Sequence, residues 1–257
     1  MPTLPEATLP ATDPAEVDAW HRDDWLDALN RLAAWRGLVN ARRVPLRFVP
    51  GEDASALDYE RRIHEAGEIA CRAEGGGARH DFHNALVWLR FPRLKGVFNQ
   101  LHCEQGAVAP ALPSRSSGAR GRGHQRDAIT LLDEGGAIWP APATLWVEAL
   151  QARQWQRLFT QYRPALGRRF APVIIGHGLL EKLHRPYKSM TAKLLICTSP
   201  RTGLDRGAAL QVRDMALRDI FRPRMLVPMP IQGWPGWDPA NDDPAFYDDV
   251  SVFRAPR

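Results

Sequence analysis

The sequence lacks most of the features that reveal a function directly. No run of about 18 apolar residues occurs, so we expect no membrane span. The three cysteines, Cys71, Cys103 and Cys197, are odd in number and widely spaced. This spacing argues against a disulfide framework or a cysteine metal cluster and predicts a reducing, cytoplasmic environment. A phosphate-binding glycine loop, an H-E-x-x-H zinc signature and a nucleophile elbow are also missing, so no motif names a reaction.

Lysine is scarce as well. The chain has 34 Lys and Arg residues and a net charge of +5, but the only lysines are Lys95, Lys182, Lys188 and Lys193. Acidic residues are interspersed with the arginines, and the arginine bias is typical of a GC-rich genome. We therefore expect a mixed solvated surface, with nucleic acid as an alternative partner that is not favoured. Where arginine is the default cation, a lysine marks a place that needs a compact ammonium group.

The length and composition predict one main domain. With 257 residues, 44% of them apolar, the chain can bury a sizeable core. Residues 1–14 are rich in Pro, Thr and Ala and lack the basic start and apolar middle of a signal peptide, so they are predicted to form a flexible tail. Residues 15–257 are predicted to form a single α+β domain.

Periodicity and breakers give the expected order of elements. Helices are expected over residues 15–36, where Gly37 ends the helix and Trp20, Leu29, Leu32 and Trp35 face the core, and then over 55–73, 80–102, 144–162 and 204–221. Leu145, Leu150, Trp155, Leu158 and Phe159 are expected to be the core residues of the helix at 144–162. Strands are expected over 44–49, 170–175 and 190–197, with a β-hairpin over 128–139 and a mobile loop at about 106–125. The fold prediction is α+β: a helix-rich N-terminal part packed with a small mixed or antiparallel sheet, then a long irregular Pro/Trp-rich C-terminal segment from residue 222.

The stretch 79–102 carries an unusual number of polar side chains among large apolar ones. His80 and Asn84 are four residues apart, and Lys95, Asn99 and His102 follow at spacings of four and three. Each set therefore lies along one helix face. Phe91-Pro92 is expected to break the helix, because proline disfavours helix in the residue before it but can open a new one. Such faces can bring polar groups to the wall of a cleft.

Gly176-His177-Gly178 lies between a predicted strand and a predicted short helix that ends at Leu183. A histidine at a helix N-terminus meets the positive end of the dipole, which favours the neutral imidazole that acts as a base or metal ligand. Glu181 lies one turn later and could orient the ring. A capped surface histidine beside a helical ion pair is the structural alternative.

Two further sets of polar residues can be interpreted either as functional or as structural. His80-Asp81 with His83 and His102 could supply metal ligands, although no pair has a diagnostic ligand spacing, and the alternative is that they satisfy backbone ends. We predict no cofactor and keep a divalent metal as the alternative, without a closed zinc centre. In the predicted hairpin, Asp133-Glu134 suits turn chemistry, or else the strand carries Asp127 and Asp133 to a shared cleft.

These blocks together resemble a bacterial family described as domain of unknown function 3025. The resemblance rests on a first block of His80, Asp81, Asn84, Trp88, Phe91, Pro92, Lys95 and Asn99, a second of Arg126, Asp127, Thr130, Asp133, Glu134 and Gly136, a third of Gly176, His177, Leu180, Glu181 and Lys182, and a closing segment at 235–249. It covers about residues 20 to 255 and implies no activity. His83 and His102 are not clearly part of this pattern, which weakens the metal alternative.

The leading hypothesis is a cytoplasmic enzyme, a hydrolase or lyase, that uses acid–base chemistry on a small anionic or carbonyl-bearing substrate. Its predicted catalytic residues are His80, Asp81, His177 and Glu181, with Glu181 orienting His177 as the base. Its predicted substrate-binding residues are Asn84, Lys95, Asn99, Arg126, Asp127, Asp133 and Lys188. One alternative is a non-catalytic protein that binds nucleic acid or an anionic metabolite through Arg126, Lys95, Lys188 and the loop at 114–125. Another is a buried polar network without a ligand. Cys103 is interpreted as structural, because its neighbour His102 points elsewhere on a helix.

Overall fold

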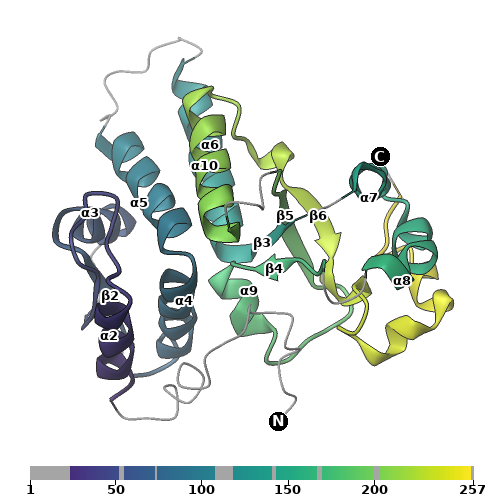
Figure 1. Ribbon diagram of the computed structural model, residues 1–257, viewed down its shortest axis with the longest axis horizontal. Helices are drawn as coiled ribbons and strands as arrows, with labels where there is room; N and C mark the ends of the chain where they lie inside the picture. Colours follow the sequence, from purple (N-terminus) through teal and green to yellow (C-terminus); the bar gives the residue numbers. More distant parts are fainter. Residues whose placement is uncertain are drawn as a thin grey trace.

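The fold is α+β, as predicted. The computed structural model describes residues 24–51, 55–72, 74–107, 118–140, 143–166, 170–198 and 203–255 (Figure 1). The predicted flexible tail and the first part of the first predicted helix lie outside these residues. None of the described helices is long and apolar enough to cross a membrane.

The N-terminal layer consists of helix α2 (Trp25–Trp35), strand β1 (Arg47–Pro50), helix α3 (Ala56–Ala66) and strand β2 (Glu68–Cys71), and the two strands pair in parallel. Helix α2 buries Trp25, Leu29 and Ala33, which are four residues apart. Trp35 was expected on the same face, but it is 79% exposed. It lies two residues after Ala33, and such a step points to the opposite side of a helix.

Helix α3 ends earlier than predicted. Gly67 has φ +70° and a backbone N–H that bonds to the Ile63 carbonyl, so it terminates the helix in the left-handed conformation. A Cβ at Gly67 would lie 2.2 Å from the carbonyl oxygen of Pro45, so glycine also permits the close approach of the two segments. The helix predicted to continue to residue 73 is instead strand β2.

Helices α4 (Ala78–Arg90) and α5 (Pro92–Ala107) break at Phe91-Pro92, as predicted. The prediction for the next segment was wrong. Residues 118–125, expected in a mobile loop, and the first arm of the expected hairpin form one helix, α6 (Gly118–Gly135). Ala128, Ile129 and Leu132 are fully buried at the spacing of a helix face. The apolar pairs before the Asp-Glu-Gly-Gly sequence resembled a strand that enters a turn, but the glycines end a helix.

The larger sheet is mixed, with strand order β4-β3-β5-β6. It contains β3 (Gly136–Trp139), β4 (Val173–Ile174), β5 (Thr191–Ile196) and β6 (Val227–Pro230). Strand β3 runs parallel to β5, and the other two pairings are antiparallel. The strands expected within 170–175 and 190–197 are present. Strand β6 was not predicted, because its two prolines are tolerated only where a strand lies at the edge of a sheet.

The second half also contains helices α7 (Thr144–Gln151), α8 (Arg163–Leu166), α9 (His177–Lys182) and α10 (Leu204–Leu217), with a π-helical turn at Arg157–Gln161. Of the predicted core residues at 144–162, Leu150, Trp155, Leu158 and Phe159 are buried, whereas Leu145 is exposed. The C-terminal segment forms short 3-10 turns at Pro223–Met225, Ile231–Gly233, Pro239–Asp242 and Pro244–Asp248. It places Trp234 edge-on against Trp139 of the sheet.

Two hydrophobic cores hold the molecule together. A smaller one joins α2, β1, β2 and one face of α4, and the larger one joins α5, α6, α10, the four-stranded sheet and the C-terminal segment. Figure 1 shows this order along the longest axis, from α2 and α3 at one end, through α4 and α5, to α7 and α8 at the other. The polar residues of α4 and α6 lie where the two cores meet.

Candidate functional site

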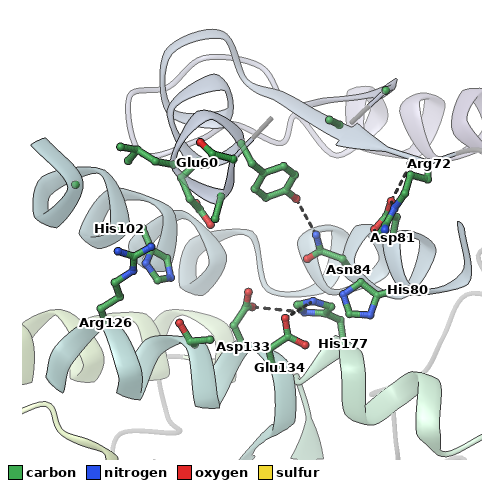
Figure 2. Close-up of a pocket in the computed structure, with 18 residues that line it drawn as sticks. Glu60, Arg72, His80, Asp81, Asn84, His102, Arg126, Asp133, Glu134 and His177 are labelled. Atoms are coloured by element: carbon green, nitrogen blue, oxygen red, sulfur yellow. Dashed lines mark hydrogen bonds and ion pairs between the residues drawn. The ribbon is translucent and has the colours of Figure 1, made fainter. Parts of the chain in front are cut away.

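A cleft of about 440 Å³ opens between the N-terminal layer and the rest of the molecule (Figure 2). Its polar lining comes mainly from five helices and the segment after β2, and includes Tyr59 and Glu60 of α3, Arg72 after β2, His80, Asp81 and Asn84 of α4, His102 of α5, Arg126, Asp133 and Glu134 of α6, and His177 of α9. Six of the predicted catalytic and substrate-binding residues, all from α4, α6 and α9, therefore line one cleft. A seventh, Glu181, contacts His80 of that group.

Two histidines and a glutamate meet at one side of the cleft. The rings of His80 and His177 pack edge to face with centroids 4.5 Å apart. The Nε2 atom of His177 lies 3.4 Å from Oε1 of Glu134. This polar contact with His177 lowers the pKa of Glu134 below its ordinary value, so Glu134 is a carboxylate. One ligand atom of each residue lies within 4.8 Å of the others, so the three could hold a metal ion.

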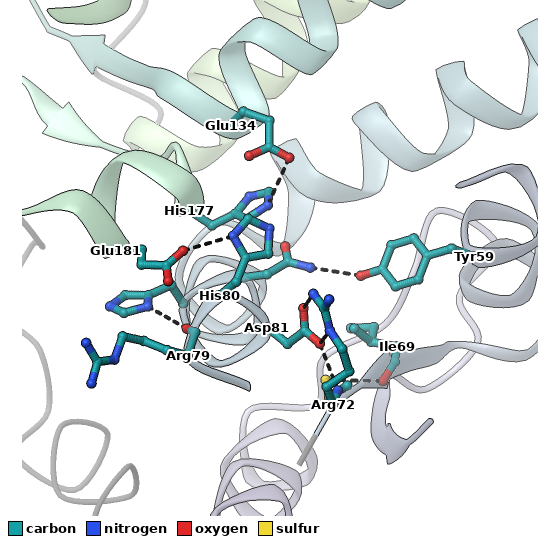
Figure 3. A network of polar contacts seen from close by, with 12 residues as sticks. Tyr59, Ile69, Arg72, Arg79, His80, Asp81, Glu134, His177 and Glu181 are labelled. Atoms are coloured by element: carbon teal, nitrogen blue, oxygen red, sulfur yellow. Dashed lines mark hydrogen bonds and ion pairs between the residues drawn. The ribbon is translucent and has the colours of Figure 1, made fainter. Parts of the chain in front are cut away.

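Glu181 does not orient His177, contrary to the prediction. Its Oε2 lies 3.2 Å from Nδ1 of His80, which comes from a helix 101 residues earlier (Figure 3). His177 instead faces Glu134 through Nε2, and its Nδ1 lies 3.9 Å from Oδ1 of Asp133. The predicted pairing failed because α9 packs on α4, which brings His80 closer to Glu181.

His80 and Asp81 do not form a pair. The Asp81 carboxylate accepts two hydrogen bonds from the Arg72 guanidinium, each at 2.7 Å, and one from the Arg72 backbone N–H. Consecutive residues on a helix point about 100° apart, which explains why the two side chains separate. Asp81 therefore fixes the end of β2 beside the cleft, while His80 faces the cluster.

Glycines allow α9 to approach the end of α6. A Cβ at Gly176 would lie 2.4 Å from the Gly136 backbone nitrogen and 2.7 Å from the Glu134 carbonyl oxygen. A Cβ at Gly178 would lie 2.8 Å from Oε2 of Glu134 and 3.8 Å from Cε1 of His80. The Gly-His-Gly sequence is thus needed to seat His177 next to Glu134.

We expect Gly176→Ala to lower the free energy of unfolding by about 1–3 kcal/mol, because the added methyl group meets backbone atoms that cannot rotate away. Chemical denaturation followed by circular dichroism measures the change. Gly135→Ala is the matched control, since a Cβ there meets nothing within 4 Å. Equal stability of the two variants would contradict the close approach.

Behind the cluster, Asp133 forms a buried ion pair with Lys95. The Lys95 ammonium donates to both carboxylate oxygens, at 2.6 and 2.9 Å, and lies 5.4 Å from the centre of the Trp88 ring. Burial raises the pKa of Asp133, but the ammonium group of Lys95 and the neighbouring His177 outweigh this effect and leave the pKa below its ordinary value. Lys95 was predicted to bind substrate; its side chain is only 6% exposed and belongs to this pair.

On the opposite wall of the cleft lies Glu60, a carboxyl group whose pKa is raised rather than lowered. Burial raises the pKa of Glu60 above its ordinary value and outweighs the hydrogen bond from Asn99 and the charges of Lys95 and Arg126. Asn99, predicted to contact substrate, is buried and donates from Nδ2 to both the Glu60 carbonyl and Oε2, each at 2.7 Å. Asn99 therefore positions Glu60.

Two more hydrogen-bonding groups face the same space. Asn84 donates to the Tyr59 hydroxyl at 2.8 Å, and burial raises the pKa of this tyrosine well above its ordinary value. The tyrosine is thus a neutral donor. Burial lowers the pKa of His102 to about 4, so its imidazole is neutral at physiological pH.

Three predicted residues differ in their surroundings. Arg126 is exposed, lines the cleft and forms no ion pair with a described residue, which leaves its charge for a ligand. Asp127, next to it on α6, is exposed and does not line the cleft. Lys188 pairs with Asp249 at 3.1 Å and lies 4.3 Å from the centre of the Phe246 ring, so it anchors the C-terminal segment.

The set of metal ligands that the sequence analysis kept as an alternative does not assemble. His83 is buried, its Nδ1 contacts the Arg79 carbonyl at 2.6 Å, and its Nε2 lies 3.0 Å from Nε2 of His184. Burial lowers the pKa of His83 to about 4. With Asp81 held by Arg72, only His80 of these alternative ligands joins the cluster.

Sequence reasoning missed Tyr59 and Glu60, and it read Glu134 only as a turn residue. Tyr59 and Glu60 occur in the run Asp-Tyr-Glu-Arg-Arg, which resembles a solvated helix face. Their position opposite the histidines follows from the packing of α3 on α5. For Glu134 a signal existed, because helical spacing through Ala128, Ile129 and Leu132 places it after a buried face rather than in a hairpin turn.

A family model described as "Protein of unknown function (DUF3025)" matches residues 46–257. No curated protein and no solved structure matches the chain. The match covers the whole cleft and its supporting helices from α3 onward.

Proposed function

Because the chain belongs to the DUF3025 family, whose description assigns no activity, we propose a function from the cleft: a cytoplasmic hydrolase that acts on a small anionic substrate with a carbonyl group. His80 is the general base, Glu181 orients it, Glu60 is the general acid, and Arg126 binds the anionic group. Asn84 and Tyr59 are available to hold the carbonyl.

The observation that carries this proposal is the pairing of His80 with Glu181 across the cleft from Glu60. The contact of 3.2 Å between Nδ1 of His80 and Glu181 leaves Nε2 as the proton acceptor. An imidazole between a carboxylate and a reacting group is a recurrent base arrangement in hydrolases. On the facing wall, burial raises the pKa of Glu60 and so favours its protonated form. A buried carboxyl group whose pKa is raised is typical of general acids.

The proposed reaction needs no group beyond substrate and water. His80 Nε2 takes a proton from water as the water oxygen bonds to the carbonyl carbon. The bond from that carbon to the leaving atom then breaks, and Glu60 gives its proton to the leaving atom. His80 returns its proton to solvent and Glu60 regains one, which restores both groups.

The charge of the cleft supports an anionic substrate. Arg126 has no carboxylate partner among the described residues, whereas the other described cations near the cleft, Arg72 and Lys95, are engaged by Asp81 and Asp133. The alternative of a non-catalytic protein that binds nucleic acid or an anionic metabolite depended on the three cations Arg126, Lys95 and Lys188 together with the loop at 114–125. Lys95 is buried and Lys188 lies against the C-terminal segment, so these three do not share a face.

The test of Glu60 uses the leaving group. We expect Glu60→Gln to slow hydrolysis of alkyl esters and amides by about 100-fold or more, the effect of losing a general acid. Hydrolysis of p-nitrophenyl esters should change much less, because their leaving group departs without protonation. A panel of carboxylate-bearing esters and amides assayed with both leaving groups measures this.

The wild-type rate should also fall as pH rises through the Glu60 pKa, since only the protonated acid is active. That pKa is raised, so the fall begins above the range of an ordinary glutamate, and Glu60→Gln should abolish it. Glu65→Gln, an exposed glutamate on the same helix, is the matched control. Equal loss with both leaving groups, or an unchanged pH profile, would remove Glu60 from the acid role.

A further inference from the structure

We propose that His80, Glu134 and His177 together bind one divalent transition-metal ion, with zinc as the best-fitting ion. The inference deepens the proposed hydrolase function and rests on it for what the ion does in the reaction: the ion activates the attacking water, and His80 becomes a ligand of the ion instead of the base. The binding itself is inferred from the geometry of the three side chains.

The distances between the candidate ligand atoms would allow them to bind one metal ion after small side-chain rotations. Two donors at about 2.1 Å from a tetrahedral zinc ion lie about 3.4 Å apart. Nε2 of His177 and Oε1 of Glu134 are already separated by 3.4 Å. All three candidate ligand atoms lie within 4.8 Å of one another. Because Glu181 contacts Nδ1 of His80, the Nε2 atom of His80 is left as the metal ligand.

Each of the two histidines also has a carboxylate near its other ring nitrogen, Nδ1. Metal-binding histidines usually donate their other ring N–H to a carboxylate, which fixes the tautomer and strengthens the ligand. Glu181 contacts Nδ1 of His80 at 3.2 Å, and Asp133 lies 3.9 Å from Nδ1 of His177. That Nδ1 of His177 is buried without a hydrogen-bond partner. With Nε2 on a metal, Nδ1 would carry the proton and Asp133 would accept it.

The surroundings leave room for a reactive ion. Glu134 is 51% exposed and His80 is 30% exposed, so both reach the cleft, while His177 forms the buried side. Gly178 leaves free the space between Glu134 and His80, where a Cβ would lie 2.8 Å from Oε2 of Glu134. Three protein ligands leave a coordination position for water, which is the pattern of catalytic rather than structural zinc sites.

The donor set favours zinc over harder ions. Two imidazoles and one carboxylate suit zinc and its neighbours, whereas magnesium and calcium prefer oxygen ligands. A bound zinc ion lowers the pKa of its water to about 7. When zinc is bound, the proton of the zinc-bound water is released to solvent, and His80 serves as a metal ligand instead of a base.

Calorimetric titration of the metal-free, tag-free full-length protein with ZnCl₂ tests the site. We expect one equivalent to bind, and Glu134→Gln, which alters a half-exposed side chain, to weaken binding at least 100-fold. Glu181→Gln should weaken it by about 10- to 100-fold, the effect of losing a supporting carboxylate. His124→Asn and Asp127→Asn change an exposed histidine and an exposed carboxylate on α6, so they are the matched controls and should bind as the wild type does.

Cobalt provides a second readout, because Co²⁺ in a four- or five-coordinate site absorbs visible light. Glu134→Gln should lose this signal, and the two control variants should keep it. Circular dichroism confirms that each variant is folded. Absence of stoichiometric binding, or equal affinity of wild type and Glu134→Gln, would overturn the site. Zinc binding without hydrolysis of any substrate in the panel supports the metal site and counts against the proposed function. Hydrolysis that survives chelation, with no zinc bound, overturns the metal site and leaves His80 as the base.

Discussion

Replacing His80 with asparagine is expected to slow hydrolysis by about 100-fold or more while leaving thermal stability nearly unchanged. Losing a general base costs about that factor, and losing the ligand of a metal-bound water costs at least as much. His80 is partly exposed and, among the described residues, its side chain forms a hydrogen bond only with Glu181, so little packing is lost. Asparagine keeps a polar side chain of smaller size in the same helix.

The measurement is kcat/KM on the best ester of the panel, together with the melting temperature. His124→Asn is the control, because it removes an exposed histidine from α6 without approaching the cleft. Full activity of the His80 variant would leave the proposed reaction without its base or ligand. Unfolding of the variant would instead assign His80 to the packing between α4 and α9.

The largest loss of stability is expected from Lys95→Met. The side chain of Lys95 is 6% exposed and that of Asp133 is 18% exposed, so removal of the ammonium leaves a buried carboxylate without its partner. Breaking a buried pair in this way typically costs about 3–5 kcal/mol. Urea denaturation at neutral pH, followed by circular dichroism, measures the free energy of unfolding.

The double variant Lys95→Met/Asp133→Leu separates the charge from the packing. It should recover most of the lost stability, because apolar residues of similar size can replace a buried ion pair at little cost. A loss below about 1 kcal/mol in the single variant would show that the pair behaves like one at the surface. A double variant less stable than Lys95→Met would show that packing, rather than the isolated charge, dominates.

Local patterns predicted the elements that depend on neighbours in the chain. The break at Phe91-Pro92 follows from the restriction that proline places on the preceding residue, and the start of α9 follows from glycines on both sides of His177. The same rules failed where one local sequence pattern was compatible with two different structures. In α6, apolar pairs followed by Asp-Glu-Gly-Gly fit either a hairpin or the end of a helix. Burial of Ala128, Ile129 and Leu132 on one face, which depends on the packing of distant segments, decides for the helix.

By itself, the sequence determined the polar faces of α4 and α5 and the histidine between two glycines at the start of α9, from which candidate site residues could be chosen. Helical spacing and glycine positions are local properties, so they can be read without the fold. Only the tertiary structure decided which groups meet. Glu181 contacts His80 rather than His177, Lys95 is buried against Asp133, and Glu60 faces the histidines across the cleft. Each of these partnerships joins helices that are far apart in the chain. Their partners are set by how the helices pack, and no spacing along the chain encodes that.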